Sequence, residues 1–477
     1  MRPSGRAGRV GDGRGPGGLR THAVVVGASW AGLLTARVLA DQVDRVTVLE
    51  QRPPPGPGVS LAPQGRFPHV LLGSGAIELE RLLPGFAAEL AARGAQVGTP
   101  SSGRWWNGGY RATGGPAARE QVMAIPLASR GLIETVLRER VAATPGIELC
   151  YGVKVAGLAG SARRVTGVRL GTGAEGAGLA ADLVVDASGR QSPLVGWLEA
   201  LGVAPPTVEQ VAVDLTYAVT FVEPPAWPLG PGITYAVSQN LPPEWPRFGL
   251  ALAVEGGRWA VLVGGYHGDR PPVDPDGFRA FAASLPAPDL TQVLAAAPAV
   301  GAIHTYRFRS SQRRRFERLR RLPAGLVPLG DTVCSFNPLY GQGMSVAALQ
   351  ARALDRLLAR HGPRDLPPRA AVRAFARVVD NPWQIAAGAD FAYPETTGPR
   401  PPGDALIAGY LDRVLAATTA DYTVNLAMSR VQHLLAAPSS LFCPPTLVRV
   451  LRAASSRRPA VAGVAQPAPP SAHEPAT

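Results

Sequence analysis

A glycine-rich turn between two apolar runs is the part of the sequence best equipped for chemistry. Gly27 and Gly32 flank the turn, and Glu50 closes the second apolar run, residues 45–49. Gly27 permits a sharp bend, the N–H groups that start the next helix suit a pyrophosphate, and Gly32 lets that helix pack closely on the strand. A carboxylate at Glu50 can accept hydrogen bonds from ribose hydroxyls. The spacing predicts a dinucleotide-binding βαβ unit, with Ser29 standing where a second glycine is usual.

A second glycine-rich segment follows another apolar run late in the chain. Gly330 and Asp331 end the run, Pro338 follows, and Gly341 and Gly343 precede a helical pattern. An aspartate at the end of a strand can hold the hydroxyls of a ribityl chain. The N–H groups that start the helix can stabilise a ring that becomes negative on reduction. The two segments together predict a flavin site rather than an ordinary connecting loop.

The composition limits the classes of function that remain open. The formal net charge is +13, but it comes from scattered arginines without an aromatic stacking platform, and Lys154 is the only lysine. A solvated basic surface is therefore favoured over nucleic-acid binding. Cys150, Cys334 and Cys443 show no paired spacing, so we expect no metal site and no disulfide framework. Without a signal peptide or a run of about 18 apolar residues, we expect a cytoplasmic protein with no transmembrane segment.

These motifs resemble those of the FAD-dependent aromatic-hydroxylase superfamily, which includes squalene epoxidase. The late segment matches the superfamily's Gly-Asp fingerprint, although Cys334 replaces a frequent His and Ser345 a frequent Asn. Ser188 and Gly189 match a mid-chain Asp-Gly fingerprint, with Ser188 in place of the Asp. Arg130 matches a helix-borne Arg that contacts the FAD phosphates. Because the Asp helps hold the nicotinamide donor in the superfamily, its replacement implies poor use of NADPH, or electrons from a separate flavin reductase.

A narrower resemblance extends over nearly all of residues 21–455. The segments 27–32, 63–66 with His69, 186–189 and 337–344 resemble actinobacterial FAD-dependent epoxidases, which oxidise polyene chains on the way to polyether ionophores. The resemblance implies a monooxygenase that uses FAD, with O2 as co-substrate. One oxygen atom would pass through a flavin C4a-hydroperoxide to an apolar natural-product intermediate, with epoxidation of a polyene or polyketide favoured. The alternatives are hydroxylation of a phenolic substrate, alkene reduction of the geranylgeranyl-reductase type and a non-catalytic flavoprotein.

The expected site combines residues from both glycine-rich segments with those that the resemblance adds. The residues expected to bind FAD are Gly27, Ala28, Ser29, Gly32, Glu50, Gln51, Arg66, Arg130, Val155, Ser188, Gly189, Gly330, Asp331, Pro338, Gly341, Gln342, Gly343 and Met344. Those expected to contact the substrate are Phe336, Asn337, Tyr340 and Tyr217. No side chain is assigned as a catalytic acid or base, because the flavin carries the chemistry. The expected partners are an apolar small molecule and, in one alternative, a flavin reductase.

The predicted fold is α/β, with a Rossmann-like FAD-binding domain, an inserted antiparallel β-sheet substrate domain and a C-terminal helical region. Period-2 alternation over residues 211–268 indicates the inserted sheet. Its inward positions could form a hydrophobic trough from Val211, Val213, Leu215, Tyr217 and Val219. We expect a disordered arm over residues 1–20, an FAD-binding domain over 21–200 and 311–362, a substrate domain over 201–310, a helical region over 363–452 and a disordered tail over 453–477.

Overall fold

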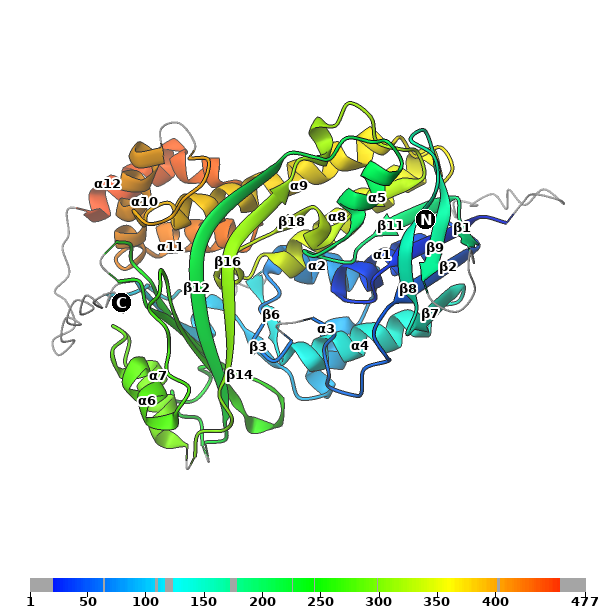
Figure 1. The fold of residues 1–477 in the computed structure, drawn as a ribbon. Helices are drawn as coiled ribbons and strands as arrows, with labels where there is room; N and C mark the ends of the chain where they lie inside the picture. Colours follow the sequence, from blue (N-terminus) through cyan, green and yellow to red (C-terminus); the bar gives the residue numbers. More distant parts are fainter. Residues whose placement is uncertain are drawn as a thin grey trace, which may run out of the picture.

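The computed structural model describes residues 20–62, 65–107, 110–115, 123–171, 178–224, 226–243, 245–297, 299–400 and 404–454. Apart from residue 20 and residues 453–454, the expected N-terminal arm and C-terminal tail lie outside the described residues. Pro63 and Gln64 of the 63–66 segment also lie outside them. The described part contains a parallel sheet and a larger sheet, with helices packed around both (Figure 1).

A five-stranded parallel sheet carries the glycine-rich turns. Its strands, in order across the sheet, are β17 (Leu326–Pro328), β11 (Leu183–Asp186), β1 (His22–Val26), β2 (Arg45–Glu50) and β7 (Ile147–Tyr151). All four neighbouring pairs are parallel, and the central strands are buried on both faces, as their continuous apolar sequences predict. Because β1, β11 and β17 are adjacent and parallel, the three segments that follow them begin at the same edge of the sheet.

Helices and two small sheets complete the layer around the parallel sheet. The helices are α1 (Trp30–Ala40), α2 (Gly73–Leu82), α3 (Phe86–Ala92), α4 (Arg130–Ala142), α5 (Leu194–Ala200) and α8 (Gly343–His361). One small sheet contains β8 (Lys154–Gly160), β9 (Val165–Gly171) and β10 (Gly178–Ala180), and the other pairs β3 (Gln96–Gly98) with β6 (Ile125–Leu127). Buried side chains of α1, α4 and α8 form one core cluster with those of β1 and β2. This is the arrangement that a βαβ unit requires.

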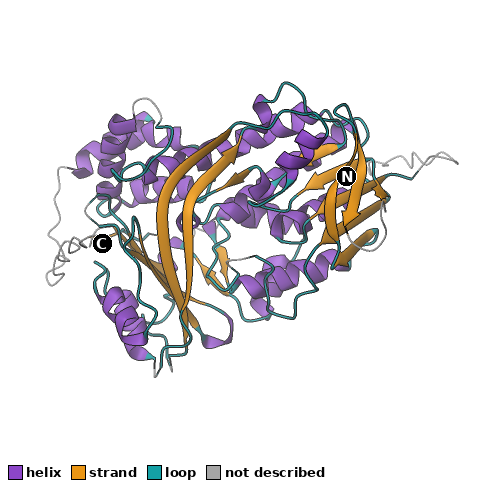
Figure 2. Cartoon of the chain, in the orientation of Figure 1, coloured by secondary structure: helices purple, strands orange, loops and turns teal. Residues whose placement is uncertain are grey.

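The second large element is an eight-stranded sheet. Its strands are, in order, β18 (Cys334–Ser335), β16 (His304–Arg314), β12 (Val208–Val222), β15 (Trp259–Gly265), β14 (Phe248–Ala253), β13 (Tyr235–Gln239), β4 (Gly103–Asn107) and β5 (Tyr110–Arg111). Every pair is antiparallel except β13 with β4. In Figures 1 and 2, β12 and β16 run as two long curved strands through the middle of the molecule. Helices α6 (Pro275–Ala283) and α7 (Asp289–Ala296) pack on one face through their own core cluster.

The expected hydrophobic trough is part of the protein core. Its five side chains, from Val211 to Val219, are each at most 4% exposed and pack in one cluster with side chains of β1 and β11. The period-2 pattern therefore identifies which residues share a face of the sheet. The pattern does not show whether solvent or the rest of the chain covers that face.

The C-terminal part is helical, as expected. It contains α9 (Pro368–Asp390), α10 (Asp404–Thr418), α11 (Tyr422–Gln432) and α12 (Pro444–Ala454). Helix α9 packs on α8, whereas α10, α11 and α12 share a small core at the opposite end of the molecule from β1 and β2 (Figure 1). None of the helices in the described ranges is long and apolar enough to cross a membrane. The α/β fold class predicted from the sequence is confirmed.

Gly32 tests the packing of α1 on the first turn. A Cβ atom at Gly32 would overlap the carbonyl oxygen of Gly27, so we expect Gly32→Ala to lower the free energy of unfolding by about 1–3 kcal/mol. Gly196→Ala is the matched control, because Gly196 lies in α5 and a Cβ there has no atom within 4 Å. The control should be neutral or stabilising by about 0.5–1 kcal/mol in urea unfolding. Equal effects of the two substitutions would contradict this account.

Candidate active site

The turn after β1 is held by backbone groups and by Glu50. Gly27 has a φ of +101°, and its N–H donates to the carbonyl oxygen of Leu49 at 2.8 Å. The Glu50 carboxylate is 8% exposed and accepts from the backbone N–H groups of Ala28 at 3.1 Å and Arg52 at 3.0 Å. The acid at the end of β2 is therefore fixed beside the first turn of the βαβ unit.

The mid-chain fingerprint lies directly against this turn. A Cβ atom at Gly27 would come within 2.7 Å of the carbonyl oxygen of Ala187. Ser188 donates through its backbone N–H and its hydroxyl to Asp186 Oδ1, at 3.1 and 2.6 Å, and the hydroxyl of Ser192 donates to the other carboxylate oxygen. Burial raises the pKa of Asp186 despite these hydrogen bonds. The carboxylate of this segment is thus Asp186, which is fully buried, and Ser188 is bonded to it.

The late fingerprint brings α8 to the start of α1. Gly330 has a φ of +68°, and a side chain there would come within 2.7 Å of Ala31 Cβ. The indole N–H of Trp30, the first residue of α1, donates to the carbonyl oxygen of Met344 at 2.9 Å. Asp331 lies at the same end of α8, since its Oδ1 is 4.0 Å from the position of a Cβ on Gly343. Two helix N-termini and Asp331 therefore meet in one place.

A buried ion pair adjoins these two helix ends. Arg130, at the start of α4, donates through Nε and Nη2 to Glu134 Oε1, at 2.8 and 2.5 Å. Glu134 also accepts from the hydroxyls of Ser29 at 3.2 Å and Ser60 at 2.6 Å. Burial opposes ionisation of Glu134, but the Arg130 charge and the hydrogen bonds outweigh it and lower its pKa. The guanidinium carbon of Arg130 lies 5.5 Å from the centroid of the Trp30 ring, which ties the pair to α1.

Positive charge surrounds Asp331. Burial raises its pKa, whereas the charges of Arg130, Arg190 and Arg314 act in the opposite direction. Arg190 is positioned by the hydroxyls of two serines, at 3.2 Å and 2.9 Å, and Arg314 donates to the carbonyl oxygen of Thr332 at 2.8 Å. Three arginines from three elements therefore converge on the carboxylate. Such an environment suits a ligand that carries negative charge.

Residues 337–340 (Asn337, Pro338, Leu339 and Tyr340) form a tight turn before α8, called the 337–340 turn below. Asn337 is fully buried, and its Oδ1 accepts from the N–H of Leu339 at 3.0 Å. Its Nδ2 donates to Asp390 Oδ1 at 2.8 Å, and the Tyr340 hydroxyl donates to the same oxygen at 2.9 Å. Helix α9 thus holds the turn that leads into α8.

The structure places four expected site residues in other surroundings. Val155 is a core residue of β8, and Gln51 is exposed after β2. Arg66 is exposed and lies 3.4 Å from His304 Nδ1 at the start of β16. Tyr217 packs edge-on against the Phe67 ring, with the ring centroids 4.9 Å apart. The remaining expected residues lie on the turns and helix starts described above, with Phe336 buried immediately before the 337–340 turn.

Sequence reasoning missed two buried carboxylates. Glu134 lies four residues after Arg130 on one helix, and that spacing is the usual signal for an ion pair. Asp390 falls on the buried stripe of α9, after Trp383 and Ala387 at helical spacing. An acidic residue on an apolar helix face could have indicated this site, because a carboxylate is seldom buried without partners.

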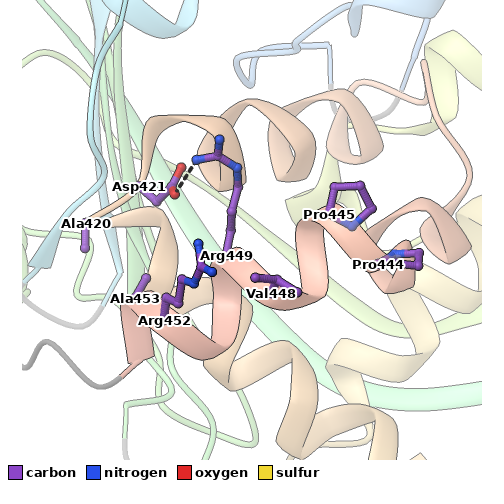
Figure 3. Close-up of a pocket in the computed structure, with 8 residues that line it drawn as sticks. All are labelled: Ala420, Asp421, Pro444, Pro445, Val448, Arg449, Arg452 and Ala453. Atoms are coloured by element: carbon purple, nitrogen blue, oxygen red, sulfur yellow. Dashed lines mark hydrogen bonds and ion pairs between the residues drawn. The ribbon is translucent and has the colours of Figure 1, made fainter.

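A surface groove of about 670 Å³ lies far from this constellation. It is formed by the start of α11 and by α12, and Figure 3 shows that Asp421 and Arg449 face each other across it, at 3.0 Å. Its two central charges therefore neutralise each other.

Within the described ranges, no group of three or more His, Cys, Asp or Glu side chains is arranged to hold a metal ion.

The buried ion pair can be tested by substitution. We expect Arg130→Met to lower the free energy of unfolding by about 3–5 kcal/mol, because it leaves the Glu134 carboxylate buried without its cation. Replacing both residues by Met should restore much of the loss. Arg45→Met is the matched control, since Arg45 pairs with Glu148 at 2.8 Å on the surface, and it should change stability by at most about 1 kcal/mol. A small effect at Arg130 in urea unfolding would show that the pair is not tightly buried.

Comparison with known proteins places this site in a known fold. Protein Rv3254 of Mycobacterium tuberculosis is 33% identical over 395 residues, which cover 80% of this chain and 82% of the relative. No protein-family model matches the chain. The structure resembles p-nitrophenol 4-monooxygenase PnpA from Pseudomonas putida DLL-E4, with a TM-score of 0.61 and 19% identity, covering 87% of this chain and 98% of that one. It also resembles a triple mutant of the flavin-dependent brominase Bmp2, with a TM-score of 0.61 and 13% identity, covering 91% and 93% of the two chains. The chain therefore belongs to the same protein family as Rv3254 and has the fold of the FAD-binding monooxygenases.

Proposed function

We propose that this protein is an FAD-dependent monooxygenase that inserts one oxygen atom from O2 into an apolar natural-product intermediate. The observation that carries the proposal is the meeting of the α1 and α8 N-termini at the Trp30–Met344 hydrogen bond. This contact brings Glu50, Asp331 and Arg130 to one region. The shared fold supports the proposal at the level of reaction type.

The residues present fit FAD. Gly27 and Gly32 leave the first turn free of side chains, so that a pyrophosphate could approach the N–H groups at the start of α1, with Arg130 beside them. Glu50 would accept from the ribose of the adenosine, and Asp331 would hold the ribityl chain. One observation fits a missing partner, since Gln342 Oε1 is buried without a hydrogen bond to any described residue.

When bound, FAD would supply the activation of O2, and the chain would supply binding, orientation and a dry site. The N-terminus of α8 would stabilise negative charge on the ring, and the 337–340 turn leads into that helix end. Phe336, buried immediately before that turn, would help to keep water from the site, since water shortens the life of reactive intermediates. The side chains expected to contact substrate carry no group that we assign as an acid or base.

Within this reaction class, we propose epoxidation of a polyene or polyketide chain. The support is the resemblance of the four motif segments to polyether epoxidases. Hydroxylation of a phenol, the activity named for PnpA, is the second candidate. We propose that electrons come from a flavin reductase, or slowly from NADPH. The reason is that Ser188 replaces the superfamily's carboxylate and bonds to Asp186.

The cofactor can be tested first. Purified protein should be yellow, and it should keep flavin absorbance through gel filtration. We expect Asp331→Ala to lose most of the bound flavin, whereas Asp276→Ala, which changes an exposed carboxylate on α6, should retain it. A colourless protein that takes up no added FAD would overturn the proposed function. Normal occupancy in Asp331→Ala would show that Asp331 does not hold the ribityl chain.

The reaction class is tested by isotope labelling. We expect incubation with ¹⁸O2, a reduced-flavin supply and a linear polyene to give an epoxide that carries one labelled oxygen atom. The same mixture with a phenol in place of the polyene is the comparison. Rapid labelling of phenols with untouched alkenes would favour the second candidate. Saturation of the alkene without oxygen uptake would identify a reductase.

A further inference from the structure

Asp390 is a fully buried carboxylate beside the 337–340 turn. It ends α9, it is 0% exposed, and its Oδ1 accepts three hydrogen bonds. The donors are Asn337 Nδ2 at 2.8 Å, the Tyr340 hydroxyl at 2.9 Å and the Tyr266 hydroxyl at 3.1 Å. Its Oδ2 is buried without a hydrogen-bond partner among the described residues. One oxygen is therefore saturated with donors, while the other has room for a proton.

Hydroxyl and amide groups rather than cations contact the Asp390 carboxylate, and Arg400 donates instead to the backbone carbonyl oxygen of Phe391 at 2.9 Å. The hydroxyls of Tyr266 and Tyr340 contact the Asp390 carboxylate. The Tyr266 ring in turn contacts the rings of Tyr393 and His267, with centroids 4.7 Å and 5.9 Å apart. The ring of His267 bonds to Thr396 instead, at 3.2 Å, and burial lowers its pKa. Asp380, the other carboxylate in the C-terminal half of α9, is bonded to Arg313 at 2.6 Å. None of the cations in the described ion pairs has Asp390 as its partner.

Desolvation and hydrogen bonding act on Asp390 in opposite directions. Burial raises its pKa to about 7, although the three hydrogen bonds favour the ionised form. Asp390 therefore changes charge near neutral pH. A rise in the pKa means that proton binding favours the folded protein, and this contribution to stability is lost as the pH rises from about 4 to about 7.

We propose that Asp390 is a positioning residue and proton store of the flavin site. It holds the 337–340 turn through Oδ1, and it takes up a proton at Oδ2 when negative charge forms at that turn. This inference rests on the proposed function, because the charge is that of the reduced ring. A buried carboxylate close to a second negative charge is unfavourable, and uptake of a proton removes the repulsion.

Reduction of bound FAD in this proposal adds one proton to the ring and one to Asp390. A nicotinamide or reduced-flavin donor delivers two electrons and one proton to the ring, which then carries one negative charge. One further proton comes from solvent and goes to Asp390 Oδ2. Oxidised FAD with an ionised Asp390 thereby becomes reduced FAD with a neutral Asp390. Two protons accompany two electrons in the wild-type protein, and one does so when position 390 cannot titrate.

The first measurement follows the protonation of Asp390 in the absence of flavin. We expect an infrared difference spectrum of the FAD-free protein, between about pH 5.5 and about pH 8.5, to show the C=O stretch of a buried carboxylic acid at the lower pH. The band should be missing in Asp390→Asn and retained in Asp365→Asn, which changes an exposed carboxylate before α9. If the band survives in Asp390→Asn, the proton is held elsewhere and the proposal fails.

The second measurement tests whether proton uptake by Asp390 is coupled to reduction of the flavin ring. Between about pH 7 and about pH 9, we expect the midpoint potential of bound FAD to fall twice as steeply with pH in wild type as in Asp390→Asn. Asp365→Asn should follow the wild type. Equal slopes in wild type and Asp390→Asn would overturn the coupling, because no second proton would then be taken up.

A second variant keeps the test decisive if Asp390→Asn does not fold. Tyr340→Phe removes one hydrogen bond that favours the ionised form, so the infrared band should persist to higher pH than in wild type. An unchanged titration would contradict the assignment of the proton to Asp390. A protein that binds no FAD overturns the proposed function and the coupling with it. The infrared band still decides in that case whether Asp390 holds a proton.

Discussion

The close approach of α1 and α8 is the constraint on which the site depends. The Trp30 indole reaches the carbonyl oxygen of a residue 314 positions later in the chain, and Gly330 makes the contact possible because it has no Cβ to collide with Ala31. The positive N-terminal ends of two helices then face one region. These ends repel each other unless negative charge lies between them. The side-chain charges at this point are Asp331, the Arg130–Glu134 pair, Arg190 and Arg314, and an anionic ligand would add negative charge beside the two helix ends.

Two buried carboxylates near this point behave in opposite ways because their partners differ. Glu134 is paired with Arg130 and accepts from Ser60, so its pKa is lowered and it stays charged. Asp390 has three neutral donors and no cation, so burial prevails and its pKa is raised to about 7. A carboxylate that stays charged does not exchange a proton near neutral pH. One that titrates near neutral pH can respond when charge changes beside it.

The fold class and the glycine-rich turns could be predicted because their signals are local. A strand, a turn and a helix within a few residues identify the positions of Gly27 and Gly330, and both turns meet at the same sheet edge. Contacts between residues far apart in the sequence have no such local signal. The alternation around Tyr217 predicts a shared face, but only the folded chain shows that Phe67 and the parallel sheet cover it. Asp390 contacts the 337–340 turn through tertiary packing that a single helix pattern does not encode.

The fold by itself does not select a reaction, since a nitrophenol monooxygenase and a brominase share it. The selection must therefore come from particular side chains rather than from the fold. Hydroxylation of a phenol is helped by a base that takes the phenolic proton, whereas epoxidation of an alkene needs none. Asp390 is the carboxylate bonded to the 337–340 turn, and its Oδ1 is already occupied by three donors. Asp390 Oδ2 has no such donor, so the carboxylate that holds the turn also keeps one oxygen that can accept a proton.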